Sequence, residues 1–391
     1  MLTRRSFLQA TALWSGSILM GCTAGGKPLP VSSKTSAWRM PDEGLLHTRT
    51  WMAFGASEAI WGTELLPEVR RNLATIATTI ARFEPVSMLV RQTEYDLARQ
   101  LVGPDVELIV APLDDLWMRD TSSIFVSAAD GSQAAIDFNF NGWGGKQTHT
   151  RDAAVAAFVA QQAGVQLLNT ALVLEGGCIE VDGEGTAIIT ESCVLNDNRN
   201  PGLTKAQFEE TLAPLLGLEK IIWLPGIAGM DITDGHTDFY ARFARPGTVL
   251  AGYDPDPESY DHAVTKQHLE ILRAATDAQG KPLDVVVLEG PLTIRDEYAN
   301  DDFAAGYIGF YVCNGAVLVQ EFGDAQADTA ARQALQRVFP DREIVQLNVD
   351  GIAAGGGTIH CATQQQPQAG QTNNSDYKLY LSMLAREVAQ R

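Results

Sequence analysis

The order of apolar and polar residues predicts alternating helices and strands from about Trp38 onward. Residues 67–83 carry apolar side chains at helical spacing with Pro67 in the first turn, which predicts a helix. Short apolar runs such as 106–110 predict buried strands. The predicted helices are 67–83, 94–101, 152–163, 204–216, 259–277 and 325–337. The predicted strands are 85–90, 106–110, 124–126, 135–138, 172–174, 178–182, 186–190, 220–223, 239–244, 248–251, 284–288, 307–312, 316–320 and 343–347.

This recurring strand–helix–strand rhythm predicts an α/β or α+β chain built of similar units. No proline-rich or charged linker divides the part after residue 37. We therefore expect residues 38–391 to form a single domain.

Composition narrows the function classes. The chain has 391 residues, of which 45% are hydrophobic and 20% charged, as in ordinary globular proteins. Its formal net charge of −19 argues against nucleic-acid binding, which needs basic surfaces. An acidic protein instead attracts cations to its clefts.

The first 37 residues resemble an export and anchoring segment. Residues 3–8, TRRSFL, match a twin-arginine signal, and the apolar run after them is too short to span a bilayer. The run ends at Leu19-Met20-Gly21-Cys22, which resembles a lipoprotein processing site. We predict a signal peptide over 1–21, a lipidated Cys22 and a tether over 22–37. The protein would then be periplasmic or in the cell envelope, touching the membrane only through this lipid.

Four cysteines remain after Cys22, namely Cys178, Cys193, Cys313 and Cys361. An exported protein permits disulfides, and Cys178 and Cys193 flank a predicted hairpin turn, so a bridge between them stays open. Cys361 is predicted to be a free thiol.

The candidate chemistry centres on residues 351–366, GIAAGGGTIHCATQQQ. Three glycines let the backbone pass close to a ligand, and they lead into a β-prone run that ends at Cys361. A thiol displayed at a strand end beside such a turn suits a nucleophile. A buried structural cysteine is the alternative, because free cysteine is among the most buried residue types.

Three upstream segments supply acidic and basic partners. Asp120 lies in WMRDT, where an ion pair between neighbours is the alternative, and Glu175 lies in LEGG, where a solvated loop carboxylate is the alternative. Residues 231–238 place three carboxylates around His236, and we expect His236 and Asp238 to share one face of the strand that follows. We predict no metal site, because no second histidine or cysteine lies there at ligand spacing.

Taken together, these segments resemble one family. The resemblance runs from about Trp38 to Arg391 and is carried by WMRDTS, FNGWGG, LEGG, residues 182–205, GHTD, NGAVLVQEFGD and GGGTIHCATQQQP. The sequence is similar to the agmatine deiminases and bacterial peptidylarginine deiminase-like proteins of the guanidino-modifying pentein superfamily. This resemblance implies a pentein α/β-propeller with five pseudo-symmetric ββαβ-type modules around a central active site. It implies neither a metal nor an organic cofactor.

The resemblance also implies catalytic roles. Asp120 and Asp238 would clamp the planar, cationic guanidinium of the substrate. Cys361 would attack the guanidinium carbon as a thiolate, which requires activation of an ordinary thiol. His236 would protonate the departing ammonia and then activate water, with Glu175 orienting it.

Trp117 and Trp143 match family positions that line the pocket. The chain departs from the usual D-x-T-N-G-H run because Asp234 replaces the asparagine and Ile232 stands where an acid can help. We include Asp234 among the predicted substrate-binding residues.

The predicted function is hydrolysis of agmatine to N-carbamoylputrescine and ammonia. Within the same chemistry, arginine and peptidyl-arginine stay open as substrates, and an amidinotransferase would use the same cysteine. A lipoprotein that only binds cationic amines is the alternative of another class. The partner is a small cationic guanidino compound, and homo-oligomerisation stays open.

Overall fold

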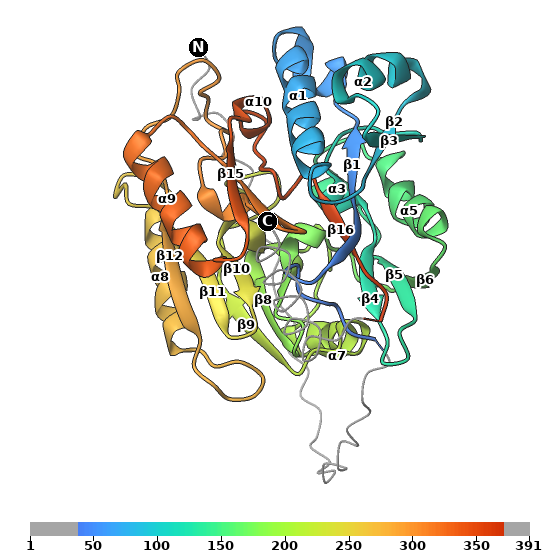
Figure 1. The fold of residues 1–391 in the computed structure, drawn as a ribbon. Helices are drawn as coiled ribbons and strands as arrows, with labels where there is room; N and C mark the ends of the chain where they lie inside the picture. Colours follow the sequence, from blue (N-terminus) through green and yellow to red (C-terminus); the bar gives the residue numbers. More distant parts are fainter. Residues whose placement is uncertain (1–37, 371–391) are drawn as a thin grey trace, which may run out of the picture. The chain divides into compact units, whose positions relative to one another are not determined.

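The structure is a computed structural model that describes residues 38–370 (Figure 1). The predicted signal peptide, Cys22, the tether and the last 21 residues of the predicted domain lie outside the described residues. Within 38–370, no helix combines the length and the apolar character needed to cross a membrane.

Five small sheets make up the described part of the chain. Four of them repeat one plan, in which two antiparallel strands are followed by a helix and a third strand parallel to the second. Their strands are β4 (Ile124–Ser127), β5 (Gln133–Asp137) and β6 (Gln166–Asn169); β7 (Ile179–Val181), β8 (Thr186–Thr190) and β9 (Lys220–Leu224); β10 (Ala241–Arg245), β11 (Thr248–Tyr253) and β12 (Asp284–Glu289); β13 (Tyr311–Cys313), β14 (Ala316–Gln320) and β15 (Glu343–Leu347). Their helices are α5 (Val155–Ala163), α7 (Lys205–Leu216), α8 (His262–Ala274) and α9 (Ala325–Val338).

The remaining sheet joins the two ends of the described chain. Its order is β16 (Gln364–Pro367), β1 (His47–Phe54), β2 (Val86–Val90) and β3 (Val106–Val110), with α1 (Glu58–Ile80) and α2 (Tyr95–Val102) between its parallel strands. β16 runs antiparallel beside β1, as Figure 1 shows, and Trp51 pairs with Gln364. This pairing fixes the segment just before β16, which carries Cys361.

Local sequence signals explain where α7 begins and ends and where α1 is broken. Thr204 and Gln207 form a capping box at the start of α7, and Gly217 ends it in the left-handed region with φ 70°. α1 begins nine residues before the predicted start, and the left-handed Gly62 (φ 65°) breaks it near its N-terminus. Pro67 lies about one turn beyond that break, where a missing amide is tolerated.

Several elements differ from the prediction. β1, β6 and β16 were not predicted, and residues 172–174 form no strand. The strand after His236 begins at Ala241 because residues 237–239 form a 3₁₀ turn, so His236 and Asp238 are presented by that turn rather than by a strand face. Likewise, Cys361 precedes a strand instead of ending one, because residues 359–363 turn back on themselves through Thr363 N–H to His360 O.

Candidate active site

Cys361 lies in the turn before β16, and its side chain is buried. Its sulfur lies 3.2 Å from Thr358 Oγ1 and 3.8 Å from Asp238 Oδ2. The backbone N–H of Arg119 donates to the Cys361 carbonyl, which ties the segment of Asp120 to this turn. Cys361 has no disulfide partner, as the sequence predicts.

The glycines before Cys361 make room for aromatic rings. A Cβ on Gly355 would lie 2.2 Å from the Trp61 ring, and a Cβ on Gly357 would lie 2.1 Å from the Trp117 ring. Both distances are far below van der Waals contact, so only glycine fits here and the two indole rings pack directly on the backbone. The sequence predicts a close approach here, and the structure identifies these side chains as what approaches.

His236 faces three carboxylates. Its Nε2 lies 3.2 Å from Glu175 Oε2, and its Nδ1 lies 3.8 Å from Asp120 Oδ1 and 3.9 Å from Asp238 Oδ1. A Cβ on Gly177 would lie 2.4 Å from His236 Nδ1 and 3.1 Å from each of the two aspartates. These groups therefore converge on one small volume that a side chain at position 177 would fill.

Asp120 is held from two sides. Trp143 Nε1 donates to Oδ2 at 3.0 Å, and Gly177 N donates to Oδ1 at 3.2 Å. Burial raises the pKa of Asp120 to about 6, and the charges of Asp238 and Glu175 add to this rise while His236 opposes it. At neutral pH the carboxyl is ionised and poorly compensated, which suits a cation.

Asp238 is held ionised by a histidine that the sequence analysis did not assign. Burial by itself raises the pKa of Asp238, but the hydrogen bond and charge of His360 outweigh it and hold the pKa below its usual value. His360 Nδ1 lies 2.7 Å from Asp238 Oδ2, and its Nε2 lies 3.0 Å from Glu43 Oε2. Asp238 Oδ1 is buried and has no hydrogen-bond donor among the described residues.

Glu43 is the buried anchor of this contact. Arg242 NH2 lies 2.8 Å from Glu43 Oε1, and Arg119 NH2 lies 3.2 Å from Glu43 Oε2. Burial raises the pKa of Glu43, but Arg242, His360 and Arg119 together hold it well below its usual value. Arg119 thus pairs with Glu43 and Gln365.

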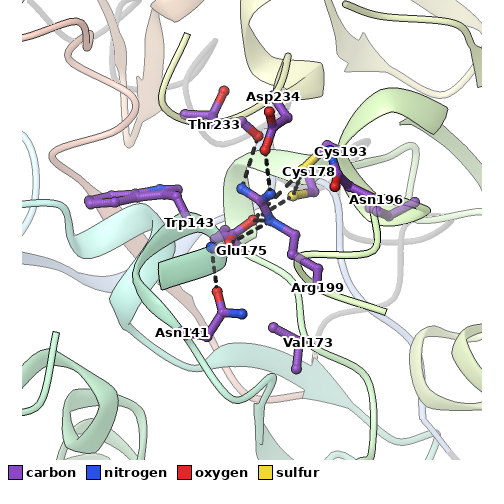
Figure 2. A network of polar contacts seen from close by, with 12 residues as sticks. Asn141, Trp143, Val173, Glu175, Cys178, Cys193, Asn196, Arg199, Thr233 and Asp234 are labelled. Atoms are coloured by element: carbon purple, nitrogen blue, oxygen red, sulfur yellow. Dashed lines mark hydrogen bonds and ion pairs between the residues drawn. The ribbon is translucent and has the colours of Figure 1, made fainter. Parts of the chain in front are cut away.

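Glu175 is fixed by Arg199, as Figure 2 shows. It is fixed by His236 as well. Arg199 Nε lies 2.9 Å from both oxygens of Glu175, and its NH1 lies 2.9 Å from Asp234 Oδ2. Lys146 Nζ lies 2.8 Å from the same Asp234 oxygen. Two cations thus neutralise Asp234, and it is not among the residues that line the cavity, from which Glu175, His236 and Asp238 are also absent.

The protonation of the two central groups follows from their surroundings. Burial and the charges of Asp238 and Asp120 raise the pKa of the Cys361 thiol well above its usual value. Burial lowers the pKa of His236. The opposing effects of Asp120, Cys193 and Glu175 are larger and raise this pKa well above its usual value. Without a ligand, the pair is a thiol and an imidazolium at neutral pH.

The cavity above these groups is acidic and partly aromatic. It has a volume of about 590 Å³ and is lined by Trp117, Trp143, Asp120 and Cys361 among others. Seven aspartates line it: Asp115, Asp120, Asp231, Asp254, Asp261, Asp301 and Asp302. Among the described residues that line it, none is lysine, arginine or histidine.

The structure therefore brings together Cys361, His236, Glu175, Asp120 and Asp238, with Trp117 and Trp143 in the cavity wall. Four residues that hold these groups in place were not identified from the sequence pattern: Glu43, Arg199, Arg242 and His360. His360 and Arg199 lie inside the motif runs 355–367 and 182–205, which was the one available signal. Cys178 and Cys193 are free thiols, and together with Glu175 and His236 they are the described group that could hold a metal.

Comparison with known proteins decides the family. The Porphyromonas-type peptidyl-arginine deiminase model matches residues 39–367. The chain belongs to this family. A Streptomyces coelicolor protein provisionally named an agmatine deiminase is 43% identical over 85% of this chain and 99% of its own length. The agmatine deiminase of Pseudomonas putida is 36% identical over 87% of this chain and 98% of its own length.

Solved structures agree with the family. The agmatine deiminase of Enterococcus faecalis superposes with a TM-score of 0.79 at 31% identity, covering 88% of this chain and all of the other. The predicted family and pentein fold are thereby confirmed, and the protein is a hydrolase of the type that acts on carbon–nitrogen bonds.

Proposed function

We propose that this deiminase hydrolyses agmatine to N-carbamoylputrescine and ammonia through a covalent intermediate on Cys361. The observation that carries the proposal is the convergence of Asp120, Asp238 and His236 on one volume beside Gly177, with the Cys361 sulfur 3.8 Å from Asp238 Oδ2. A guanidinium is flat, cationic and rich in donors. Two carboxylates with free acceptor positions therefore suit it.

Binding prepares the attack. A guanidinium between Asp120 and Asp238 neutralises the charges that keep the Cys361 thiol protonated. The substrate cation thus favours release of the thiol proton to solvent and leaves the thiolate, which is the nucleophilic form. The sulfur then adds to the guanidinium carbon and gives a tetrahedral adduct.

His236 completes the first half of the reaction. It is already an imidazolium and transfers its proton to the leaving nitrogen, so ammonia departs and an S-alkylthiouronium remains on Cys361. The neutral imidazole next accepts a proton from water, which attacks the same carbon. Collapse of that adduct breaks the carbon–sulfur bond, and the hydroxyl proton passes to the departing sulfur, so that the neutral carbamoyl product and the Cys361 thiol result. Glu175 orients the His236 ring throughout.

The cavity favours agmatine over free arginine. Agmatine carries an amine at its far end, whereas arginine adds a carboxylate. Seven aspartates line the cavity, and none of its described lining residues is a cation that could pair with a carboxylate. Burying an unpaired carboxylate there would be costly. Peptidyl-arginine has a neutral backbone at this point, so it is the second candidate within the same chemistry.

The test is ammonia release from a panel of agmatine, arginine, arginine-containing peptides and methylated guanidines. We expect agmatine to give the highest kcat/KM, and higher turnover of a peptide would favour the second candidate. Cys361→Ala should lower turnover of every compound by about 10⁴-fold or more while the far-UV spectrum is kept. Normal turnover in that variant refutes the mechanism. Release that requires an added amine acceptor would instead indicate amidino transfer.

A further inference from the structure

A second group of reactive side chains lies directly behind His236. Cys178 lies in the 3₁₀ turn Gly176–Cys178, and Cys193 lies in α6 (Glu191–Val194). One ligand atom from each of these cysteines, from Glu175 and from His236 lies within 4.8 Å of every other. Figure 2 shows the two sulfurs beside the Glu175–Arg199 pair. The proposed reaction uses neither cysteine.

The distances approach those of a metal site. The two sulfurs are 3.0 Å apart, and Glu175 Oε2 lies 3.1 Å from Cys178 Sγ, 3.8 Å from Cys193 Sγ and 3.2 Å from His236 Nε2. Zinc bond lengths to sulfur, nitrogen and oxygen place the donors of a tetrahedral site roughly 3.3–3.8 Å apart. The sulfurs therefore need to part by less than about 1 Å.

The charges also suit a divalent cation. Binding would release three protons to solvent, one from each thiol and one from His236 Nε2, and leave two thiolates beside the Glu175 carboxylate. One divalent cation and the Arg199 guanidinium, whose Nε lies 2.9 Å from both Glu175 oxygens, neutralise these three negative charges. Two sulfurs, one imidazole and one carboxylate are donors that thiophilic ions such as Zn²⁺ prefer.

We propose that Glu175, Cys178, Cys193 and His236 form an inhibitory site for one thiophilic divalent cation. The inhibition rests on the proposed function, whereas the binding does not. An ion on His236 Nε2 leaves the only ring proton on Nδ1, which faces Asp120 and Asp238. That nitrogen then has no lone pair to accept a proton from water, so hydrolysis of the intermediate stops.

Binding is tested with Co²⁺, whose thiolate bands report sulfur ligation. The full-length chain carries Cys22→Ser and Cys361→Ala, which removes the terminal thiol and the cavity thiol, and is kept reduced with a phosphine. We expect one cobalt per chain, thiolate charge-transfer bands, visible bands of tetrahedral cobalt, and displacement by Zn²⁺. Adding Cys178→Ala or Cys193→Ala should abolish the bands and weaken cobalt binding by more than about 100-fold. Loss of a residue that only supports a metal ligand typically weakens binding by about 10- to 100-fold, so a larger effect indicates loss of a ligand itself.

The matched control is Cys313→Ala, which removes a buried thiol elsewhere in the described chain and should keep the bands. Bands that persist without Cys178 and Cys193, or no sulfur ligation at all, overturn the site. A reduced chain that instead closes a Cys178–Cys193 disulfide on addition of cobalt overturns it equally.

Inhibition is tested separately in the chain that retains Cys361. Prolonged incubation with Zn²⁺ should remove agmatine turnover, and a chelator should restore it. The rate of each variant with Zn²⁺ is compared with the rate of the same variant without the ion. The factor by which Zn²⁺ lowers agmatine turnover should be at least about tenfold smaller in Cys193→Ala than in the chain that retains Cys193. Equal loss in that variant overturns the inhibitory role. Absence of turnover in the untreated chain contradicts the proposed function but leaves the cobalt result to stand on its own.

Discussion

His360 Nδ1 lies 2.7 Å from Asp238 Oδ2, so the residue next to Cys361 in the chain holds one of the two aspartates that converge beside Gly177. Both ring nitrogens of His360 face carboxylate oxygens, since Nε2 lies 3.0 Å from Glu43. Both nitrogens can donate only in the imidazolium form. The carboxylate of Asp238 is thus held by a histidine whose other ring nitrogen is anchored on Glu43, and this contact lowers the pKa of Asp238.

His360→Phe should therefore weaken substrate binding through Asp238, although the side chain at position 360 does not itself contact the substrate. A hydrogen bond to a charged group is worth about 1.5–3 kcal/mol, so we expect kcat/KM for agmatine to fall about 10- to 100-fold. The pKa of Asp238 should rise because its main opposing contact to burial is lost. The acid limb of kcat/KM against pH should consequently move to higher pH.

His47→Phe is the matched control for this change. His47 is also buried and also meets a carboxylate, since its Nδ1 lies 3.0 Å from Glu84 Oε1, but Glu84 is not one of the carboxylates that converge beside Gly177. It should lower stability while leaving the acid limb in place. If both variants shift the limb alike, His360 acts only through the stability of the fold.

Asp120 should set the acid limb of the wild-type profile. Its pKa is raised to about 6, chiefly by burial, and the substrate cation needs the ionised carboxylate. As the pH falls through about 6, Asp120 takes up a proton and kcat/KM should fall about tenfold per pH unit. The acid limb of kcat should lie at lower pH than that of kcat/KM, because the bound substrate cation favours the ionised form of Asp120.

Trp143→Phe provides a directional check on that assignment. Trp143 Nε1 donates to Asp120 Oδ2 at 3.0 Å, and this bond lowers the pKa of Asp120. Its removal should move the limb of kcat/KM upward. Trp117→Phe alters another wall of the cavity and should not move it. A wild-type limb well below pH 5 contradicts the role of Asp120.

Export through the N-terminal segment is tested by substitution. Arg4→Lys together with Arg5→Lys should keep the enzyme in the cytoplasmic fraction, because a twin-arginine signal needs both guanidinium groups. Cys22→Ser should leave it exported but not labelled by a radioactive fatty acid. Recovery of the double lysine variant in the envelope fraction would contradict twin-arginine export.

Sequence patterns identified the elements whose apolar period is clear. The strands at 186–190, 316–320 and 343–347 have the predicted bounds, since each is a short apolar run between turn residues. β16, by contrast, has the sequence Gln-Gln-Gln-Pro and no β-prone character. It is a strand only because β1, more than 300 residues earlier, offers it hydrogen bonds.

The same limit applies to the site. Motifs revealed Cys361, His236 and the carboxylates that surround them, because each lies in a run with unusual glycine or polar content. Glu43 has no such surroundings, and its contact with His360 joins residues separated by 317 positions. Such a contact depends on tertiary folding that no local pattern records.

Arg199 should be essential to stability rather than to binding of substrate. Its side chain is fully buried between Glu175 and Asp234. Arg199→Met would leave His236 beside Glu175 and Lys146 beside Asp234, but it would break two buried ion pairs at once. Breaking a buried pair costs about 3–5 kcal/mol in the free energy of unfolding. Urea denaturation followed by circular dichroism measures this loss.

Arg71→Met is the control, because Arg71 pairs with Glu68 on the surface with 59% of its side chain exposed. This variant should change the free energy of unfolding by less than about 0.5 kcal/mol. Equal midpoints for the two variants would mean that Glu175 and Asp234 find other partners when Arg199 is lost.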